Sequence, residues 1–360
     1  MANGLIPSDL VARIRRDVER SVLRATNGIK YVAGIGRPGL GLSAKDTVWT
    51  RDKVELWHYR SDARRYRPPV FLVMSLVSRS YILDLRPGNS VVEFLLGQGF
   101  DVFMLDWGVP DELEAKNTLE TYTDEYLPRA VEAVCAEAGD EAVTMLGYCF
   151  GGILALLYAA GHPGPQIRNL IAVATPFDSS NMTEFGKVLS EGRLEPEELF
   201  DENGNVPADV IAGGFRLQRP TAEFASYANL WENLWNDQYV EAYQAMDTWA
   251  RDQIPFAGAC FAQTTRLLSR QNAFAKGTLR LGGRTVRVSD ITCPFLNVIA
   301  EHDHLVPVGA AAPLTRGVGS KDVEELRLSA GHVGLFVGRS GQKVTLPKVA
   351  DWIRRHSDPA

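Results

Sequence analysis

The chain has 360 residues, of which 45% are hydrophobic and 23% are charged, and this composition is typical of a soluble globular enzyme. A formal net charge of −6 and a pI of about 5.6 give no basic signature, so nucleic-acid binding is not expected. No apolar stretch reaches the roughly 18 residues needed to cross a bilayer, and no signal peptide is visible. These absences predict a cytoplasmic protein.

The first predicted element is an amphipathic helix over residues 8–30. Its apolar positions recur every four residues, at Leu10, Ile14, Val18 and Val22. The opposite face carries five arginines, namely Arg13, Arg15, Arg16, Arg20 and Arg24. Such a face is usually solvated, although basic amphipathic helices also bind partners or surfaces.

Strands and helices then alternate. Residues 47–60 and 69–77 have strand-like apolar runs, and a helix is expected around residues 90–96. A strand over residues 101–106 and a helix over residues 122–137 follow. This alternation predicts a mainly parallel sheet with helices on both faces. Four arginines before the second strand (Arg60, Arg64, Arg65 and Arg67) are expected to face solvent, and the alternative is that they bind phosphates.

The segment Gly147-Tyr148-Cys149-Phe150-Gly151 lies between a predicted strand over residues 142–146 and a predicted helix over residues 153–160. A strand, a sharp Gly-x-nucleophile-x-Gly turn and a helix resemble the nucleophile elbow of α/β-hydrolases. Cys149 stands where those enzymes usually have serine. The following helix directs its free N–H groups at the thiol and favours the thiolate, so the pattern indicates thioester chemistry.

The alternation stops after a strand over residues 169–174. Residues 177–290 are rich in aromatic side chains and read as a mostly helical cap between strands 6 and 7. Strands over residues 295–300 and 323–328 and a helix over residues 343–356 complete the pattern. The predicted organisation therefore begins with an N-terminal helix and lead-in over residues 1–46. The catalytic core follows in two parts, over residues 47–176 and 291–360. The cap, residues 177–290, is inserted between these two parts.

A catalytic cysteine needs a base, and the base needs an orienting acid. In the α/β-hydrolase order these follow the nucleophile, each after a strand, which selects Asp303 and His332. Glu301 is the rival acid, whereas Asp106 is expected to be structural. The predicted oxyanion hole uses the backbone N–H groups of Phe150 and, by position, Val77. The spacing of the other cysteines, Cys135, Cys260 and Cys293, suits neither disulfides nor zinc. Cys135 in a helical run and Cys293 before an apolar strand are expected in the core, and buried and inert is the default for Cys260.

The ordered set of motifs resembles the polyhydroxyalkanoate synthases over most of the chain. It comprises the cysteine elbow, Tyr81-Ile82-Leu83-Asp84-Leu85, Asp106-Trp107-Gly108, Ile291-Thr292-Cys293-Pro294, Asp303-His304-Leu305-Val306-Pro307 and Gly331-His332-Val333-Gly334. The short length is similar to the class III and class IV synthases, which act with a companion subunit. Phe150 departs from the family pattern, in which this position is less bulky, and this puts the accepted acyl side-chain size in doubt.

The resemblance implies an acyltransferase that polymerises (R)-3-hydroxyacyl-CoA, with 3-hydroxybutyryl-CoA the expected substrate, and releases CoA. It also implies a homodimer, a companion subunit and a location on polyester granules. No cofactor or metal is expected, since the CoA thioester is a substrate. Two alternatives stay open: a thiol-dependent hydrolase such as a depolymerase or thioesterase, and an inactive granule-associated scaffold.

Overall fold

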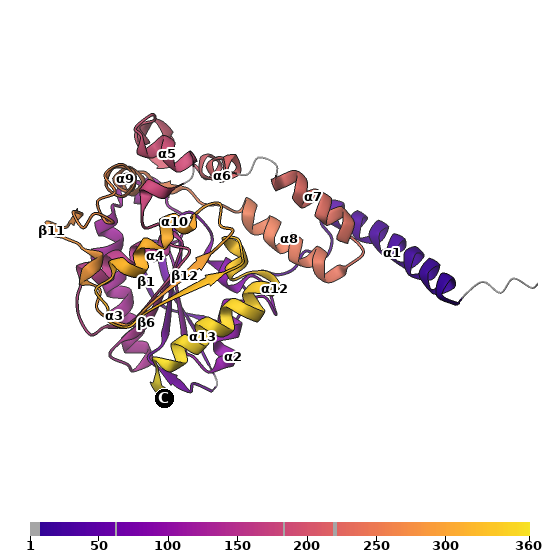
Figure 1. Cartoon of the computed structure of the whole chain (residues 1–360), viewed down its shortest axis with the longest axis horizontal. Coiled ribbons are helices and arrows are strands. Elements are labelled where there is room, and N and C mark those ends of the chain that lie inside the picture. Colours follow the sequence, from indigo (N-terminus) through magenta and orange to yellow (C-terminus); the bar gives the residue numbers. More distant parts are fainter. Residues whose placement is uncertain (1–7, 62, 183, 219–221) are drawn as a thin grey trace, which may run out of the picture. The chain divides into compact units, whose positions relative to one another are not determined.

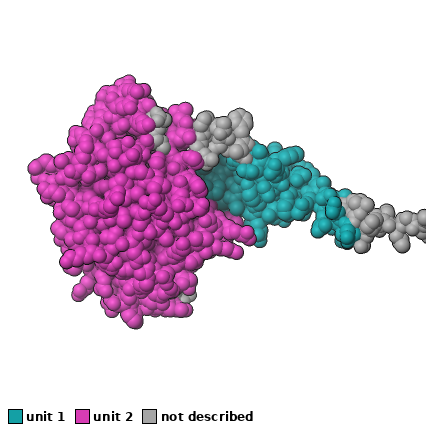
Figure 2. All heavy atoms as spheres, viewed as in Figure 1, with its two compact units in different colours: residues 1–40, 219–251 teal, residues 41–218, 252–360 magenta. Residues whose placement is uncertain are grey.

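The computed structural model describes residues 8–61, 63–182, 184–218 and 222–360. The chain forms two compact units (Figure 2). One comprises Met1–Leu40 and Arg219–Arg251, and the other comprises Gly41–Gln218 and Asp252–Ala360. The larger unit contains the sheet and all the residues of the predicted active site.

An eight-stranded sheet forms the centre of the larger unit, with strand order β1-β2-β5-β4-β6-β7-β12-β13. β1 and β2 pair antiparallel, and β2 is antiparallel to β5. The other neighbouring strands are parallel, as the alternation of strands and helices predicts. The strands are β1 (Asp46–Arg51), β2 (Val54–Tyr59), β4 (Val70–Val73), β5 (Val102–Asp106), β6 (Val143–Tyr148), β7 (Ile167–Val173), β12 (Phe295–Ala300) and β13 (Val323–Leu328).

Helices cover both faces of this sheet (Figure 1). α2 (Val91–Gln98) packs beside α13 (Leu346–Arg355). The main hydrophobic core is formed by residues of α3 (Leu127–Ala138) and α4 (Phe150–Gly161) together with alternate residues of the strands. In β5, for example, Phe103 and Leu105 belong to that core. The inner strands β4 and β6 have no exposed residue, which explains their continuous apolar runs. This confirms the predicted α/β-hydrolase fold class.

The prediction of a single strand over residues 47–60 was wrong, because this stretch is the β1–β2 hairpin. The turn contains Asp52, which adopts a φ of 53°. Aspartate visits this left-handed region more readily than most residues, since its short side chain can bond locally. Two antiparallel strands with apolar residues on both sides of such a turn are easily read as one.

The insertion between β7 and β12, the sixth and seventh strands of the sheet along the chain, is mostly helical. Its first and last parts belong to the larger unit and contain α5 (Glu184–Ser190), α6 (Ala208–Leu217), α9 (Gly258–Gln263) and the short strands β8 (Asn205–Val206), β9 (Phe256–Ala257), β10 (Arg280–Leu281) and β11 (Arg284–Thr285). Further short strands and α-helices of this unit are β3 (Tyr66–Arg67), α10 (Val308–Ala311), α11 (Pro313–Gly317), α12 (Gly338–Ser340) and β14 (Asp358–Pro359). The predicted domain boundaries stay predictions.

In the described part of the smaller unit there are three helices: α1 (Ser8–Ala33), α7 (Ala222–Asn233) and α8 (Asp237–Arg251). A small core of Leu230, Leu234 and Val240 holds it together, with Tyr31 of α1 packed against it. Asn27 of α1 donates hydrogen bonds to Leu234 O and to Asp237 Oδ1, both at 2.7 Å. Among the described residues, no helix combines the length and the apolar character needed to cross a membrane.

Candidate active site

The predicted elbow joins β6 to α4. Cys149 lies between them with φ 56° and ψ −123°, a conformation that is costly for any residue other than glycine. Its N–H donates to Val173 O of the neighbouring strand at 2.8 Å. α4 begins at the next residue, so the half-buried thiol stands at the positive end of this helix.

Small residues allow this turn to form. A Cβ atom on Gly151 would lie 2.2 Å from Val73 O, and one on Gly152 would lie 2.0 Å from Thr175 Oγ1. Both distances are far shorter than any van der Waals contact. The glycines therefore let α4 approach β4 and the end of β7 closely enough for Cys149 to be held at the carboxyl end of the sheet.

Replacing Gly151 with alanine is expected to destabilise the larger unit. The new methyl group would meet the backbone at Val73 and Met74, which cannot move aside as a flexible side chain could. Overpacking of this kind costs about 1–3 kcal/mol or more. Urea unfolding measures the effect, and Gly97→Ala is the matched control, because a Cβ on that exposed helical glycine has nothing within 4 Å. Equal stability of the two variants would contradict this account of the elbow.

Asp303 and His332 come together at the ends of neighbouring strands β12 and β13. His332 Nδ1 donates to Asp303 Oδ2 at 2.7 Å. The other carboxylate oxygen, Oδ1, accepts the N–H groups of Leu305 and Val306 at 2.8 and 2.9 Å. Asp303 is therefore buried, aimed at the imidazole and fixed by its own loop. The rival Glu301 is exposed.

The Cys149 side chain lies close enough to His332 to act on the imidazole. Since Nδ1 is engaged by Asp303, Nε2 is the nitrogen left to exchange a proton with the thiol. Burial acts to lower the pKa of His332, but the negative charge of Cys149 and the bond to Asp303 oppose it and raise the pKa to about 10. The arrangement thus places a nucleophile, a base and an orienting carboxylate in one row, and the base and the carboxylate are joined by a hydrogen bond.

Tyr148, which immediately precedes the nucleophile, contacts His332 through both its hydroxyl group and its ring. Its buried hydroxyl donates to the backbone oxygen of His332 at 3.2 Å, and its ring lies 5.2 Å from the imidazole. Phe336 packs against the same tyrosine ring at 5.3 Å. Sequence reasoning gave this tyrosine no role, because a contact spanning 184 residues leaves no local signal.

Phe150 is the first residue of α4, where backbone N–H groups have no partner within the helix. Its N–H is therefore available beside Cys149. The half-buried Phe150 ring packs edge-to-face against Phe256 at 5.4 Å, and Phe256 packs likewise against Phe261. The returning part of the insertion thus supplies an aromatic wall next to the elbow.

Val77 lies in the loop that follows β4. Its N–H donates a long hydrogen bond of 3.5 Å to Ser75 Oγ, a distance at which such bonds are weak. The residues after Val77 bond to residues 252 and 253. Arg79 Nε and Tyr81 Oη donate hydrogen bonds to the two carboxylate oxygens of Asp252, at 3.1 and 3.0 Å. Ser78 forms an isolated antiparallel β-bridge with Gln253. Asp252 therefore anchors the loop that carries the predicted oxyanion donor.

Replacing Asp252 with alanine is expected to lower kcat by about 10- to 100-fold with little change in KM. The loop would lose both side-chain bonds, and displacement of a catalytic group by about 1 Å can cost 10²-fold. Steady-state kinetics measures this effect. Asp247→Ala is the control, since Asp247 pairs with the neighbouring exposed Arg251 on α8 and lies far along the chain from the Val77 loop. A fall in thermal stability without a fall in kcat would assign Asp252 a structural role alone.

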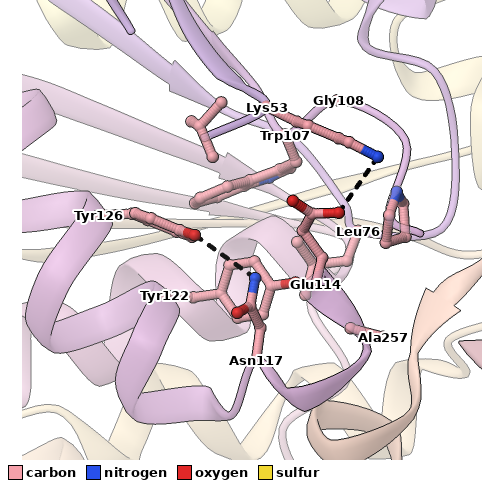
Figure 3. Close-up of a pocket in the computed structure, with 11 residues that line it drawn as sticks. Lys53, Leu76, Trp107, Gly108, Glu114, Asn117, Tyr122, Tyr126 and Ala257 are labelled. Atoms are coloured by element: carbon pink, nitrogen blue, oxygen red, sulfur yellow. Dashed lines mark hydrogen bonds and ion pairs between the residues drawn. The ribbon is translucent and has the colours of Figure 1, made fainter. Parts of the chain in front are cut away.

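A small cavity in the larger unit is separate from this site (Figure 3). Trp107, Tyr122 and Tyr126 line it together with Leu76 and Glu114, whereas Cys149, Asp303 and His332 do not. Its polar groups are paired internally. Lys53 forms ion pairs with Asp111 and, at 3.2 Å, with Glu114, and Asn117 donates to Tyr126 Oη at 3.5 Å. The charged side chains of its lining are thus engaged with one another.

Other sequence candidates lie apart from the site. Burial raises the pKa of the Cys260 thiol well above its ordinary value and that of Cys293 to about 11, so both are poor nucleophiles. Arg60, Arg64 and Arg67 are exposed or partly exposed and form ion pairs with carboxylates, among them Glu137 and Asp140. Asp106 accepts hydrogen bonds from Ser80 Oγ and Gly108 N, which fits a structural role. No cluster of three metal-ligating side chains occurs in the described ranges.

Comparison with known proteins places this geometry in a family. A family model described as alpha/beta hydrolase fold matches residues 82–338. Among curated relatives, the poly(3-hydroxyalkanoate) polymerase subunit PhaC of Haloferax mediterranei is 35% identical over 90% of this chain, which spans 66% of that longer protein. The subunit of the same name from Allochromatium vinosum is 32% identical, and the match covers 87% of this chain and 89% of the relative.

Solved structures agree on the fold. A hydrolase from Pseudomonas aeruginosa superimposes with a TM-score of 0.52 at 16% identity, covering 88% of this chain and 99% of the other. At such low identity the likeness concerns architecture alone. With the eight-stranded sheet, the family match and the curated relatives together, the chain belongs to the α/β hydrolase superfamily and, within it, to the family of poly(3-hydroxyalkanoate) polymerase subunits.

Proposed function

We propose that this chain is a catalytic subunit that polymerises (R)-3-hydroxyacyl-CoA, with 3-hydroxybutyryl-CoA as the expected monomer, into polyhydroxyalkanoate through an acyl thioester on Cys149. The observation that carries the proposal is the row formed by Cys149, His332 and Asp303, with the 2.7 Å bond between the last two. The relatives named as polymerase subunits support the same reaction.

In the first step the proton of the Cys149 thiol resides on His332 Nε2, and the thiolate attacks the carbonyl carbon of the acyl-CoA. The N–H of Phe150, with that of Val77 once it turns from Ser75, stabilises the charge on the carbonyl oxygen. The bond between carbon and the CoA sulfur then breaks. CoA leaves with the proton from the imidazolium, and the acyl group remains on Cys149.

In the second step a hydroxyl group at the end of another acyl chain gives its proton to His332 Nε2 and attacks the thioester on Cys149. The carbon–sulfur bond breaks, a new ester bond forms, and the thiolate and imidazolium are restored. Asp303 holds the imidazole in the tautomer that both steps require. Because one thioester replaces another in the loading step, cysteine suits this reaction better than serine.

The aromatic wall of Phe150, Phe256 and Phe261 is proposed to exclude water from the acyl-enzyme, which would favour chain transfer over hydrolysis. A homodimer, a companion subunit and attachment to the polyester granule complete the proposed assembly. These partners follow from the family and are proposals for this chain.

The proposed chemistry needs no metal or cofactor, since the thiolate, the imidazole and the backbone donors suffice for both steps. Exhaustive dialysis against EDTA is therefore expected to leave the rate of CoA release unchanged within about twofold. Loss of activity that added metal ions restore would show that a resident metal takes part.

The test is incubation of the purified full-length chain with 3-hydroxybutyryl-CoA, with and without a companion subunit, while free CoA and insoluble polyester are both measured. CoA release coupled to polymer supports the proposal. CoA release that yields only soluble hydroxy acid identifies a thiol-dependent hydrolase. Absence of release, with longer 3-hydroxyacyl-CoA substrates also inert, identifies an inactive scaffold.

A further inference from the structure

Helix α1 presents an exposed apolar stripe that nothing in the proposed chemistry uses. Val18, Val22, Ile29 and Val32 are 57%, 60%, 69% and 86% exposed as residues, and Ala25 is exposed between them. A shallow hollow runs along the N-terminal half of this stripe. It is lined by Asp17, Val18, Ser21, Val22 and Ala25. The side chains of Leu10 and Ile14, predicted for the same stripe, lie outside the described residues.

The opposite face of α1 is the one that packs within its own unit. Asn27 is buried through its bonds to Leu234 and Asp237, Tyr31 meets Tyr243 with ring centroids 6.0 Å apart, and Arg20 lies 4.3 Å over the Trp235 ring. At 100° per residue these side chains lie about 180–220° from Val18. The helix therefore turns part of its basic face towards its own unit and leaves its apolar stripe uncovered.

The spacing of the stripe is that of a helix-pairing seam. From Val18 to Val32 the apolar positions follow one another at intervals of four, three, four and three residues. This is the heptad pattern with which two helices pack knobs into holes over a length of about 21 Å. A lipid or polymer surface would require an apolar face but no such regular seam.

We propose that the α1 stripe is the surface on which a second copy of this chain docks, by antiparallel pairing of the two α1 helices across a twofold axis at Ala25. The small side chain at the crossing lets the helices approach closely. Val18 and Val32 lie seven residues on either side of Ala25. Each would therefore meet the other on the facing helix, which is the self-complementarity that a twofold interface requires.

Charges next to the stripe favour this direction. Glu19 and Lys30 are exposed on the same flank, six residues before and five residues after Ala25. An antiparallel pair thus sets each Glu19 near Lys30 of the partner subunit, twice by symmetry. Within the chain Glu19 already accepts from Arg15 Nε at 2.9 Å, an exposed pair that contributes little.

This inference rests on the homodimer proposed above but not on the catalytic steps, so its test is the oligomeric state of the full-length chain. Sedimentation analysis is expected to give a dimer whose Kd rises by at least about 100-fold in Val22→Asp/Ile29→Asp. Leu23→Asp, on the same helix but off the stripe, is the control and is expected to keep the wild-type Kd. Circular dichroism checks that α1 stays folded, since the substituted side chains are exposed.

Charge reversal tests the antiparallel register. Glu19→Lys and Lys30→Glu are each expected to weaken the dimer about tenfold, whereas the double variant restores it. Ala25→Cys is expected to form a disulfide with itself across the axis, and Arg16→Cys is not. The proposal is overturned by a chain that stays monomeric at all concentrations, or by a dimer that the stripe variants do not affect. Burial of the stripe only by a different protein, or by the chain's own larger unit, overturns it as well.

Discussion

Cys149→Ala is expected to abolish both CoA release and polymer formation, lowering kcat by at least about 10⁴-fold. The variant removes the atom that carries the acyl group, and residual activity from the oxyanion donors alone cannot form the covalent intermediate. The fold should persist, because the side chain is half-buried and the backbone bond to Val173 remains. Measurement of free CoA with 3-hydroxybutyryl-CoA gives the rate.

Cys293→Ala is the matched control for this variant. That thiol is also half-buried, but it lies before β12 and away from His332, and burial raises its pKa to about 11. Its loss is expected to leave the rate within about twofold of the wild type. Polymer formation by Cys149→Ala at a rate near that of Cys293→Ala would show that another group carries the acyl chain.

Asp303→Asn is expected to lower kcat by about 10⁴-fold, the second large effect. The amide can still accept from Leu305 and Val306, so the loop keeps its shape. Its NH₂ group, however, would face His332 Nδ1 and favour the tautomer with the proton on Nε2, which can no longer accept a proton from the thiol.

Glu301→Gln separates this effect from a general change of charge. Glu301 is exposed, lies two residues before Asp303 and loses the same unit of charge in the variant. We expect near wild-type kcat from Glu301→Gln and equal melting temperatures for the two variants. Similar kcat values in the two variants would show that Asp303 is not the acid that orients His332, and another carboxylate would have to be sought.

Local patterns in the sequence predicted the features that depend on local structure. The strand, turn and helix around Cys149 follow from the apolar run of β6, the glycines and the apolar run of α4, all within about twenty residues. The buried parallel strands were equally visible as continuous apolar runs. The β1–β2 hairpin was missed because its turn uses Asp52 in the left-handed region, where glycine would have marked it.

Features that depend on distant contacts were beyond the sequence. Tyr81 meets Asp252 across 171 residues, and Tyr148 meets His332 across 184. No period or motif marks either pair. The α1 helix illustrates the same limit: its amphipathic pattern was plain, yet the pattern alone could not tell which face its own unit covers. The structure buries Asn27 and leaves Val22 exposed.

The acyl-enzyme itself tests the central claim most directly. The wild-type chain is mixed with 3-hydroxybutyryl-CoA, quenched in acid during turnover and digested, and the peptides are identified by mass spectrometry. We predict a hydroxybutyryl group, removable by hydroxylamine, on the peptide that contains Cys149. Turnover with this peptide unmodified, or with the acyl group on any other residue, would contradict the proposed thioester mechanism.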